Sequence, residues 1–170
     1  KFAEDEIKAV EQVLKSGKVN YWTGDLTKKF EAEYANYHHR NYGIALSNGT
    51  LALELALIGF GIGAGDEVIT TPRTFIASSS CIVRVGATPI IADIDPNSQN
   101  IHVESIRKCL TSKTKAILVV HLGGWPADMP AIMDFAKQHN LIVIEDCAQA
   151  HGAKINGRLV GSFGHAAAFS

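Results

Sequence analysis

The amino-acid sequence predicts an α/β fold built around a mostly parallel sheet. From residue 42 onward, short apolar runs of strand type alternate with stretches of helix length, and this order is typical of α/β layers. Two of the apolar runs, residues 117–120 and 141–144, carry no polar residue at all. Such strands are buried on both faces, as the strands of parallel sheets usually are.

A helical segment, residues 1–40, is expected to precede the sheet. Apolar residues at helical spacing predict one helix over residues 5–16 and a second over residues 26–37. We expect this segment to pack onto a single domain formed by residues 41–170, because no linker or low-complexity stretch interrupts the later pattern.

Within residues 41–170 the apolar runs and the stretches between them define the expected elements in order. The strands are expected at residues 43–47, 67–70, 89–93, 116–120, 141–145 and 166–170. The helices are expected at residues 50–60, 76–85, 103–110 and 129–139.

Composition limits the classes of function. The 170 residues are 46% hydrophobic and 19% charged with a net charge of −1, which favours a soluble globular chain and disfavours a nucleic-acid or anionic-membrane surface. No apolar run is long enough to span a bilayer, and no signal-peptide pattern opens the sequence, so we expect a cytoplasmic protein without membrane contact.

Cys81, Cys109 and Cys147 lack metal-ligand spacing, and an odd number of thiols fits a reduced compartment, so we expect structural cysteines and no metal site. The sequence starts without methionine and stops inside Ala-Ala-Ala-Phe-Ser, which resembles a strand caught midway. We therefore expect it to be part of a longer polypeptide.

The turn Ser-Asn-Gly-Thr at residues 47–50 is the first place that suggests binding. It lies between a predicted strand and a predicted helix, whose first backbone N–H groups lack internal partners. With the helix dipole these groups attract an anion, Gly49 lets a phosphate approach closely, and Thr50 can add its hydroxyl. An ordinary helix cap by Ser47 or Asn48 explains the same residues.

Two carboxylates end the apolar run 141–144, and alternation turns Glu145 and Asp146 to opposite faces. A charge at a buried strand end needs a partner. A pyridinium N–H would be such a partner for Asp146, because opposite charge keeps the ring protonated and a protonated pyridoxal ring is an electron sink. The alternatives for Asp146 are a metal site shared with His151 and a structural acid that caps a neighbouring helix.

Phe75 follows the predicted strand at residues 67–70, where an aromatic ring can stack on a flat cofactor. A place in the hydrophobic core is the alternative for this residue. His121 lies at another strand end, where a site role and a structural role are both open, whereas His151 and His165 are expected to be structural.

The order and spacing of these signals resemble the DegT/StrS family of pyridoxal-phosphate (PLP) dependent nucleotide-sugar aminotransferases, in the fold type I (aspartate aminotransferase) superfamily. The resemblance covers nearly the whole sequence. Its motifs are Trp-Thr-Gly at 22–24 with Phe-Glu at 30–31, Ser-Asn-Gly-Thr at 47–50, Gly-Asp-Glu-Val at 65–68, Thr-Phe-Ile-Ala-Ser at 74–78, Gly-Ala-Thr-Pro at 86–89, Val-His-Leu-Gly-Gly-Trp-Pro-Ala-Asp-Met at 120–129, Glu-Asp-Cys-Ala-Gln-Ala-His-Gly-Ala at 145–153 and Gly-Ser-Phe-Gly-His-Ala-Ala-Ala-Phe-Ser at 161–170.

The resemblance implies a three-layer fold type I large domain with a mostly parallel mixed sheet, which is incomplete here at its C-terminal end. It also implies PLP as the cofactor, with Asp146 in a catalytic role. The implied cofactor-binding residues are Gly49 and Thr50 in the phosphate-binding turn, Phe75 stacked on the ring, Asp146 at the pyridine nitrogen, Gln149 near the ring hydroxyl and Ser170 at the phosphate.

The implied reaction moves an amino group from an amino acid, glutamate by resemblance, to a keto group of a nucleotide-linked sugar for surface-polysaccharide or secondary-metabolite synthesis. The family's Schiff-base lysine follows a Phe-Ser pair, so we expect it beyond Ser170; Lys154 lies in an expected surface stretch and lacks the burial that a nucleophilic lysine needs. Relatives with histidine at the lysine position act as sugar dehydratases, and a non-catalytic regulator is a third alternative. A homodimer with shared active sites is also implied.

Overall fold

The computed structural model describes all residues, Lys1–Ser170, and divides them into two compact units, Lys1–Ala45 and Leu46–Ser170. The first unit holds two helices, α1 (Glu4–Ser16) and α2 (Leu26–Tyr37), as the sequence predicts. Helix α1 begins with three acidic residues, which favour the positive end of the helix dipole, and ends at Gly17 in the left-handed region (φ 70°). None of the residues of α1 is buried.

The second unit is built on five parallel strands in the order β2-β1-β3-β4-β7. Their bounds are β1 (Glu67–Thr70), β2 (Thr88–Ile91), β3 (Thr114–Val120), β4 (Ile142–Asp146) and β7 (Ala166–Ala168). Strands β3 and β4 are central and largely buried on both faces, which explains their unbroken apolar sequences.

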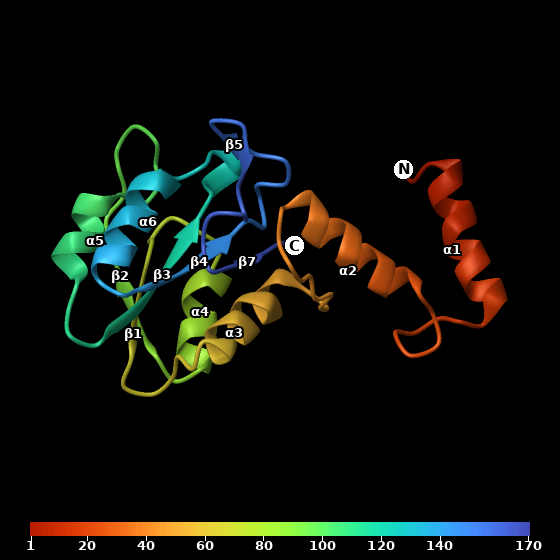
Figure 1. Cartoon of the computed structure of the whole chain (residues 1–170), viewed down its shortest axis with the longest axis horizontal. Coiled ribbons are helices and arrows are strands. Elements are labelled where there is room, and N and C mark those ends of the chain that lie inside the picture. Colours follow the sequence, from red (N-terminus) through yellow and green to blue (C-terminus); the bar gives the residue numbers. More distant parts are fainter. The chain divides into compact units, whose positions relative to one another are not determined.

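Helices cover both faces of this sheet, so the unit has three layers (Figure 1). The helices are α3 (Gly49–Gly59), α4 (Ala77–Arg84), α5 (Val103–Cys109) and α6 (Met129–Gln138). One hydrophobic cluster joins α3 and α4 to the sheet, and a second joins α5 and α6 to the opposite face. No helix in the chain has both the length and the apolar character needed to cross a bilayer.

Helix starts follow ordinary capping chemistry. The Asn48 side chain accepts from the N–H of Leu51 at 2.9 Å at the start of α3, and the Asp128 side chain accepts from Ala131 at 3.3 Å at the start of α6. The connections also contain a short 3₁₀ turn, η1 (Leu122–Gly124), and a small antiparallel hairpin of β5 (Lys154–Ile155) and β6 (Arg158–Leu159).

The strand predicted at residues 43–47 does not form. These residues form no regular secondary structure and pair with no strand of the chain, and the Ala45 N–H donates instead to the Glu31 carboxylate at 2.8 Å. Ile44 is 78% exposed. An apolar run becomes a strand only beside a partner that takes up its backbone hydrogen bonds, and this chain supplies none here. The prediction was therefore wrong for this segment.

Parallel strands bring their carboxyl ends to one edge of the sheet, where ligands of open α/β sheets usually bind. In the sheet register Val120 pairs with Asp146, and Asp146 pairs with Ala168. The segments that follow β3, β4 and β7 therefore start next to one another.

Candidate active site

Asp146 ends β4 with only 7% of its surface exposed. Its Oδ2 accepts a hydrogen bond from the Ser78 hydroxyl at 2.8 Å, and its Oδ1 accepts from the Ala148 N–H at 3.2 Å. The Ser78 hydroxyl lies 2.7 Å from the Thr74 hydroxyl, so a chain of polar groups runs from the start of α4 to the carboxylate. A carboxylate has about four acceptor positions, and two remain for a further donor.

Phe75 is adjacent to Thr74 in the first turn before α4, and its side chain is 69% exposed. The ring is therefore not part of the hydrophobic core, which was the alternative reading of this residue. An exposed aromatic face near a buried carboxylate suits a flat ring with a polar edge.

Gln149 lies three residues after Asp146 and is exposed. Its Oε1 accepts from the N–H of Gly123 at 2.7 Å, which ties it to the turn η1 after β3. Because the oxygen is engaged, the side-chain amide group is what Gln149 can offer to a ligand as a donor.

Gly49 and Ser170 meet although 121 residues separate them in sequence. The Gly49 N–H points to the Ser170 Oγ at 3.4 Å, and a Cβ atom on Gly49 would lie 2.8 Å from the Ser170 Cβ. Thr50 follows in the same first turn of α3 and is half-buried. Asn48 caps the helix, as the simpler reading of this turn expected, and the cap does not prevent the next N–H groups from facing a ligand.

Gly49, Thr50, Phe75, Asp146, Gln149 and Ser170, together called the cradle below, are linked by contacts between their segments. Ser78 joins α4 to Asp146, and the Cys147 N–H joins the end of β4 to the Ala168 carbonyl at 2.8 Å. Ser170 lies two residues further and contacts Gly49. The structure therefore brings the predicted phosphate turn, ring aromatic, strand-end acid and terminal serine to one edge of the sheet.

Glu145 points to the opposite face of β4, as strand alternation predicted. Its carboxylate accepts backbone N–H bonds from Gly161, Phe163 and Gly164, at 2.7, 2.8 and 2.6 Å. Burial tends to raise the pKa of this carboxyl, but the hydrogen bonds from His121 and from the backbone outweigh it, so the pKa is lowered from its ordinary value.

The ligand atoms of His121, Glu145 and Cys147 lie within 4.8 Å of one another, a spacing that a metal ion could use. Both ring nitrogens of His121 already have hydrogen-bond partners. Its Nε2 pairs with the Glu145 carboxylate, and its Nδ1 accepts from the Ala127 N–H. Both of its nitrogens are thus used, and the cluster is a hydrogen-bonded core. His151 contacts the carbonyl of Ser170 at 2.9 Å, which leaves the proposed pairing with Asp146 in a metal site without geometric support.

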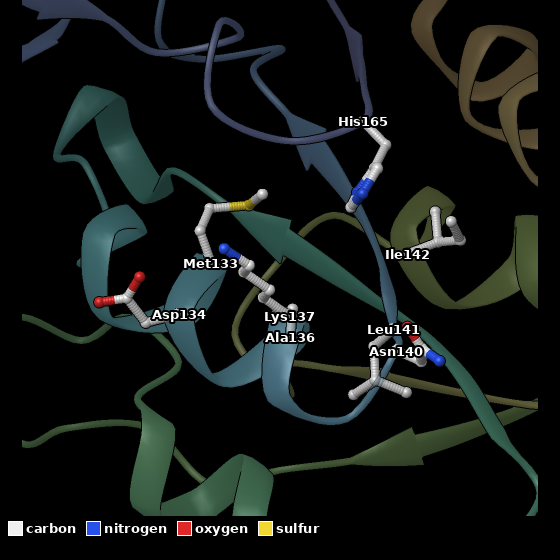
Figure 2. A pocket seen from close by; sticks show the side chains of 8 residues that line it. All are labelled: Met133, Asp134, Ala136, Lys137, Asn140, Leu141, Ile142 and His165. Atoms are coloured by element: carbon white, nitrogen blue, oxygen red, sulfur yellow. The ribbon is translucent and has the colours of Figure 1, made fainter.

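The cavity drawn in Figure 2 lies elsewhere. It has a volume of about 390 Å³ and is lined by Lys137, Asn140, Ile142 and His165 among others. Ile142 begins β4 and Asp146 ends it, so this cavity belongs to the other edge of the sheet and not to the cradle.

Reasoning from the residues missed two features. Ser78 lies in the motif at residues 74–78 but had no predicted role, although a buried carboxylate needs a donor and a serine at the start of α4 can be one. The Glu145–His121 pair was also missed, although a glutamate at the end of an apolar strand and a histidine at the end of another were both visible.

The residues at this edge fit PLP. A buried carboxylate with spare acceptor capacity suits a protonated ring nitrogen, an exposed phenyl ring suits the ring face, and a glycine-opened helix start beside a serine hydroxyl suits a phosphate.

A model of the DegT/DnrJ/EryC1/StrS aminotransferase family matches residues 1–170. Among curated proteins, a pleiotropic regulatory protein of Geobacillus stearothermophilus is 47% identical over 164 residues, covering 96% of this chain and 44% of that protein. GDP-perosamine synthase of Escherichia coli O157:H7 is 48% identical over 147 residues, covering 86% of this chain and 40% of that protein.

Solved structures of aminotransferases also resemble this chain. An aminotransferase from Psychrobacter cryohalolentis superposes with a TM-score of 0.98 at 57% identity, covering 100% of this chain and 43% of that one. The PLP form of the putative sugar aminotransferase Spr1654 from Streptococcus pneumoniae superposes with a TM-score of 0.91 at 32% identity, covering 100% of this chain and 47% of that one. The chain thus spans less than half the length of these proteins.

Proposed function

Because the chain belongs to the DegT/DnrJ/EryC1/StrS aminotransferase family, we propose that it forms the cofactor cradle of a PLP-dependent aminotransferase that acts on a nucleotide-linked sugar. The observation that carries the proposal is the Asp146 carboxylate, backed by Ser78, at the same sheet edge as the Gly49–Ser170 contact. GDP-perosamine synthase, a nucleotide-sugar enzyme by name, supports the substrate class. An amino acid, glutamate by resemblance, is the proposed donor.

In this proposal PLP supplies the electron sink for carbanion chemistry. Asp146 holds a proton at the pyridine nitrogen by opposite charge, and Ser78 fixes the direction of its carboxylate. The exposed Phe75 ring would stack on one face of the cofactor ring.

Gly49, Thr50 and Ser170 bind the phosphate through backbone N–H and hydroxyl groups at the start of α3. Gln149, held by Gly123 through its Oε1, would offer its amide N–H groups to the hydroxyl edge of the ring. Together these residues would hold and orient the cofactor for reaction with the amino donor and the keto sugar.

The test uses the full-length protein that contains this chain. Purified protein loaded with PLP is mixed with glutamate, and the cofactor absorbance is followed; we expect conversion to the pyridoxamine form, which a nucleotide-linked keto sugar then reverses. No spectral change with glutamate, glutamine, aspartate or alanine would exclude transamination as proposed.

A regulatory role is the second candidate, because the 47% identical Geobacillus protein is named a pleiotropic regulatory protein. The two candidates differ in turnover: a regulator without catalysis binds PLP and shows no amino-acid-dependent conversion of the cofactor. The same absorbance experiment therefore separates them.

We further propose a homodimer in the cytoplasm. The apolar residues Ile7, Val10 and Leu14 of α1 are more than half exposed in the single chain, a stripe that a partner could cover. Three free cysteines suit a reducing compartment. Sedimentation of the full-length protein is expected to give the dimer mass, and an active monomer would contradict the assembly.

A further inference from the structure

Glu145 is fully buried directly before Asp146, and the mechanism proposed above gives it no chemistry. Its side chain leaves β4 on the face opposite Asp146, towards the loop that precedes β7. Three backbone N–H groups of that loop, from residues 161–164, donate to its two oxygens. A buried carboxylate persists only where such donors replace water, so the loop and the charge require each other.

The loop approaches β4 too closely for side chains. A Cβ atom on Gly164 would lie 2.8 Å from the Val143 carbonyl oxygen and 3.2 Å from the Glu145 Cγ. The carboxylate therefore holds the loop at a distance that only glycine allows there. The loop continues through β7 to Ser170, whose position depends on where β7 begins.

His121 joins a second segment to the same carboxylate. The Ala127 N–H donates to its Nδ1 at 3.1 Å, so Nδ1 carries no proton and Nε2 carries it. The Nε2–H then donates to Oε2 of Glu145 at 3.1 Å. The His121 backbone N–H also donates to the Asp146 carbonyl at 3.2 Å, and the turn that follows His121 binds Gln149.

We propose that Glu145 and His121 are positioning residues for the PLP cradle. They bind together three segments: the end of β4, which carries Asp146; the turn after β3, whose Gly123 N–H binds the Gln149 side chain; and the loop before β7, the strand that leads to Ser170. The pair touches neither the ring nor the phosphate and acts by fixing the spacing of the groups that do. The inference rests on the proposed cofactor site and adds to it the device that keeps its parts in register.

Histidine and glutamate variants of the full-length protein test the pair. Each carboxylate oxygen of Glu145 accepts from two donors. Glu145→Gln keeps the size of the side chain but replaces one of these oxygens with an NH₂ group, which cannot accept, so two of the donors lose their partner. His121→Gln keeps an N–H donor near the Nε2 position, and His121→Asn keeps an acceptor near the Nδ1 position but does not reach Glu145. His165→Asn is the control, because the His165 Nδ1 likewise accepts a backbone N–H, in this case from Val143 of β4 at 2.9 Å, near the end of the strand away from Asp146.

Three quantities are measured: PLP affinity by titration of the apo-protein, the thermal midpoint without PLP, and amide exchange of residues 161–164. We expect Glu145→Gln and His121→Asn to weaken PLP binding by about tenfold or more and to speed exchange in the loop. His121→Gln should recover most of the affinity. His165→Asn should stay within about twofold of the unmodified protein.

The proposal is overturned if His121→Gln and His121→Asn lose equal PLP affinity. It is also overturned if, across all variants and the His165 control, the loss of PLP affinity is proportional to the drop in thermal midpoint. If Glu145→Gln does not fold, the two His121 variants decide alone. An unmodified protein that binds no PLP refutes the proposed function itself, whereas normal PLP binding by folded Glu145→Gln refutes only the positioning role.

Discussion

Ser78 donates its hydroxyl proton to the carboxylate of Asp146 across 2.8 Å, from the second residue of α4 to the last residue of β4. The two residues are 68 positions apart in sequence. Both are buried, so the bond is formed away from bulk water, where a hydrogen bond to a charge is strong. It fixes the direction in which the strand-end acid presents its remaining acceptor positions.

Asp146→Asn is expected to retain the fold, because the amide oxygen can still accept from Ser78 or Ala148. It should lower the transamination rate by about 100-fold or more, since a neutral amide does not stabilise a protonated ring nitrogen. Single-turnover absorbance with glutamate measures the rate, and circular dichroism checks the fold. A variant with a near-normal rate would show that Asp146 is not the ring partner.

Ser78→Ala removes one donor from the buried carboxylate. A hydrogen bond to a charged group is worth about 1.5–3 kcal/mol, so we expect a rate reduced by roughly tenfold or more with the PLP site still filled. Ser79→Ala is the control on the same helix, because Ser79 is only half-buried and the hydrogen bond to Asp146 comes from Ser78. Equal rates for the two variants would remove Ser78 from the mechanism.

Gly49→Ala is expected to weaken binding of PLP and of inorganic phosphate by about tenfold or more, because the new Cβ would lie 2.8 Å from the Ser170 Cβ and displace it. Gly59→Ala, in the same helix, has open space for its Cβ. Alanine is about 1 kcal/mol better than glycine inside a helix, so the control should bind normally and melt no lower. Titration calorimetry and thermal melting of both variants check this; normal phosphate binding by Gly49→Ala would argue against this turn.

The Glu145 carboxyl has a pKa below its ordinary value of 4.5, so its ionised form is preferred in the folded protein. Its contribution to stability is therefore complete above about pH 4.5 and is lost as the pH falls through the lowered folded-state pKa. The difference in thermal midpoint between unmodified protein and Glu145→Gln should be constant from pH 8 to pH 6 and shrink below pH 4.5. A difference that grows with acid would have the wrong sign.

Burial, together with the nearby Asp146 charge, raises the pKa of the Cys81 thiol to about 12. The thiolate is the reactive form, so Cys81 should resist a thiol reagent such as iodoacetamide at pH 8 until the protein unfolds. Cys109, which is half-buried, is the internal comparison. Mass spectrometry of digested native and denatured samples gives the labelling at each cysteine, and rapid native labelling of Cys81 would contradict the buried position.

Local sequence patterns predicted most of the elements, since apolar runs such as 117–120 are buried on both faces and helix 26–37 was placed with its observed bounds. The failure at residues 43–47 has a physical cause: strand formation depends on a neighbour, which a local pattern does not contain. For the hairpin at residues 154–159 only a surface position was predicted, although Asn156 and Gly157 carry the Asn-Gly signal of a tight turn and both adopt positive φ.

The positions of Asp146 and Gly49 could be predicted because strand ends and helix starts are readable in sequence. Their partners could not, because the Ser78 and Ser170 contacts depend on which strands are adjacent and on how α3 and α4 pack. Ser170 was predicted as a site residue only from the resemblance to a family, and the bond between Ser78 and Asp146 is visible only in the structure.

The contact between Gly49 and Ser170 also bears on how the chain acquires its structure. Joining residues 121 positions apart costs more chain entropy than forming the local helices or the neighbouring β3–β4 pair. We therefore expect the phosphate end of the cradle to be completed late in folding, after the centre of the sheet. During synthesis Ser170 leaves the ribosome long after Gly49, so the contact proposed to bind phosphate can form only after all five strands of the sheet have emerged.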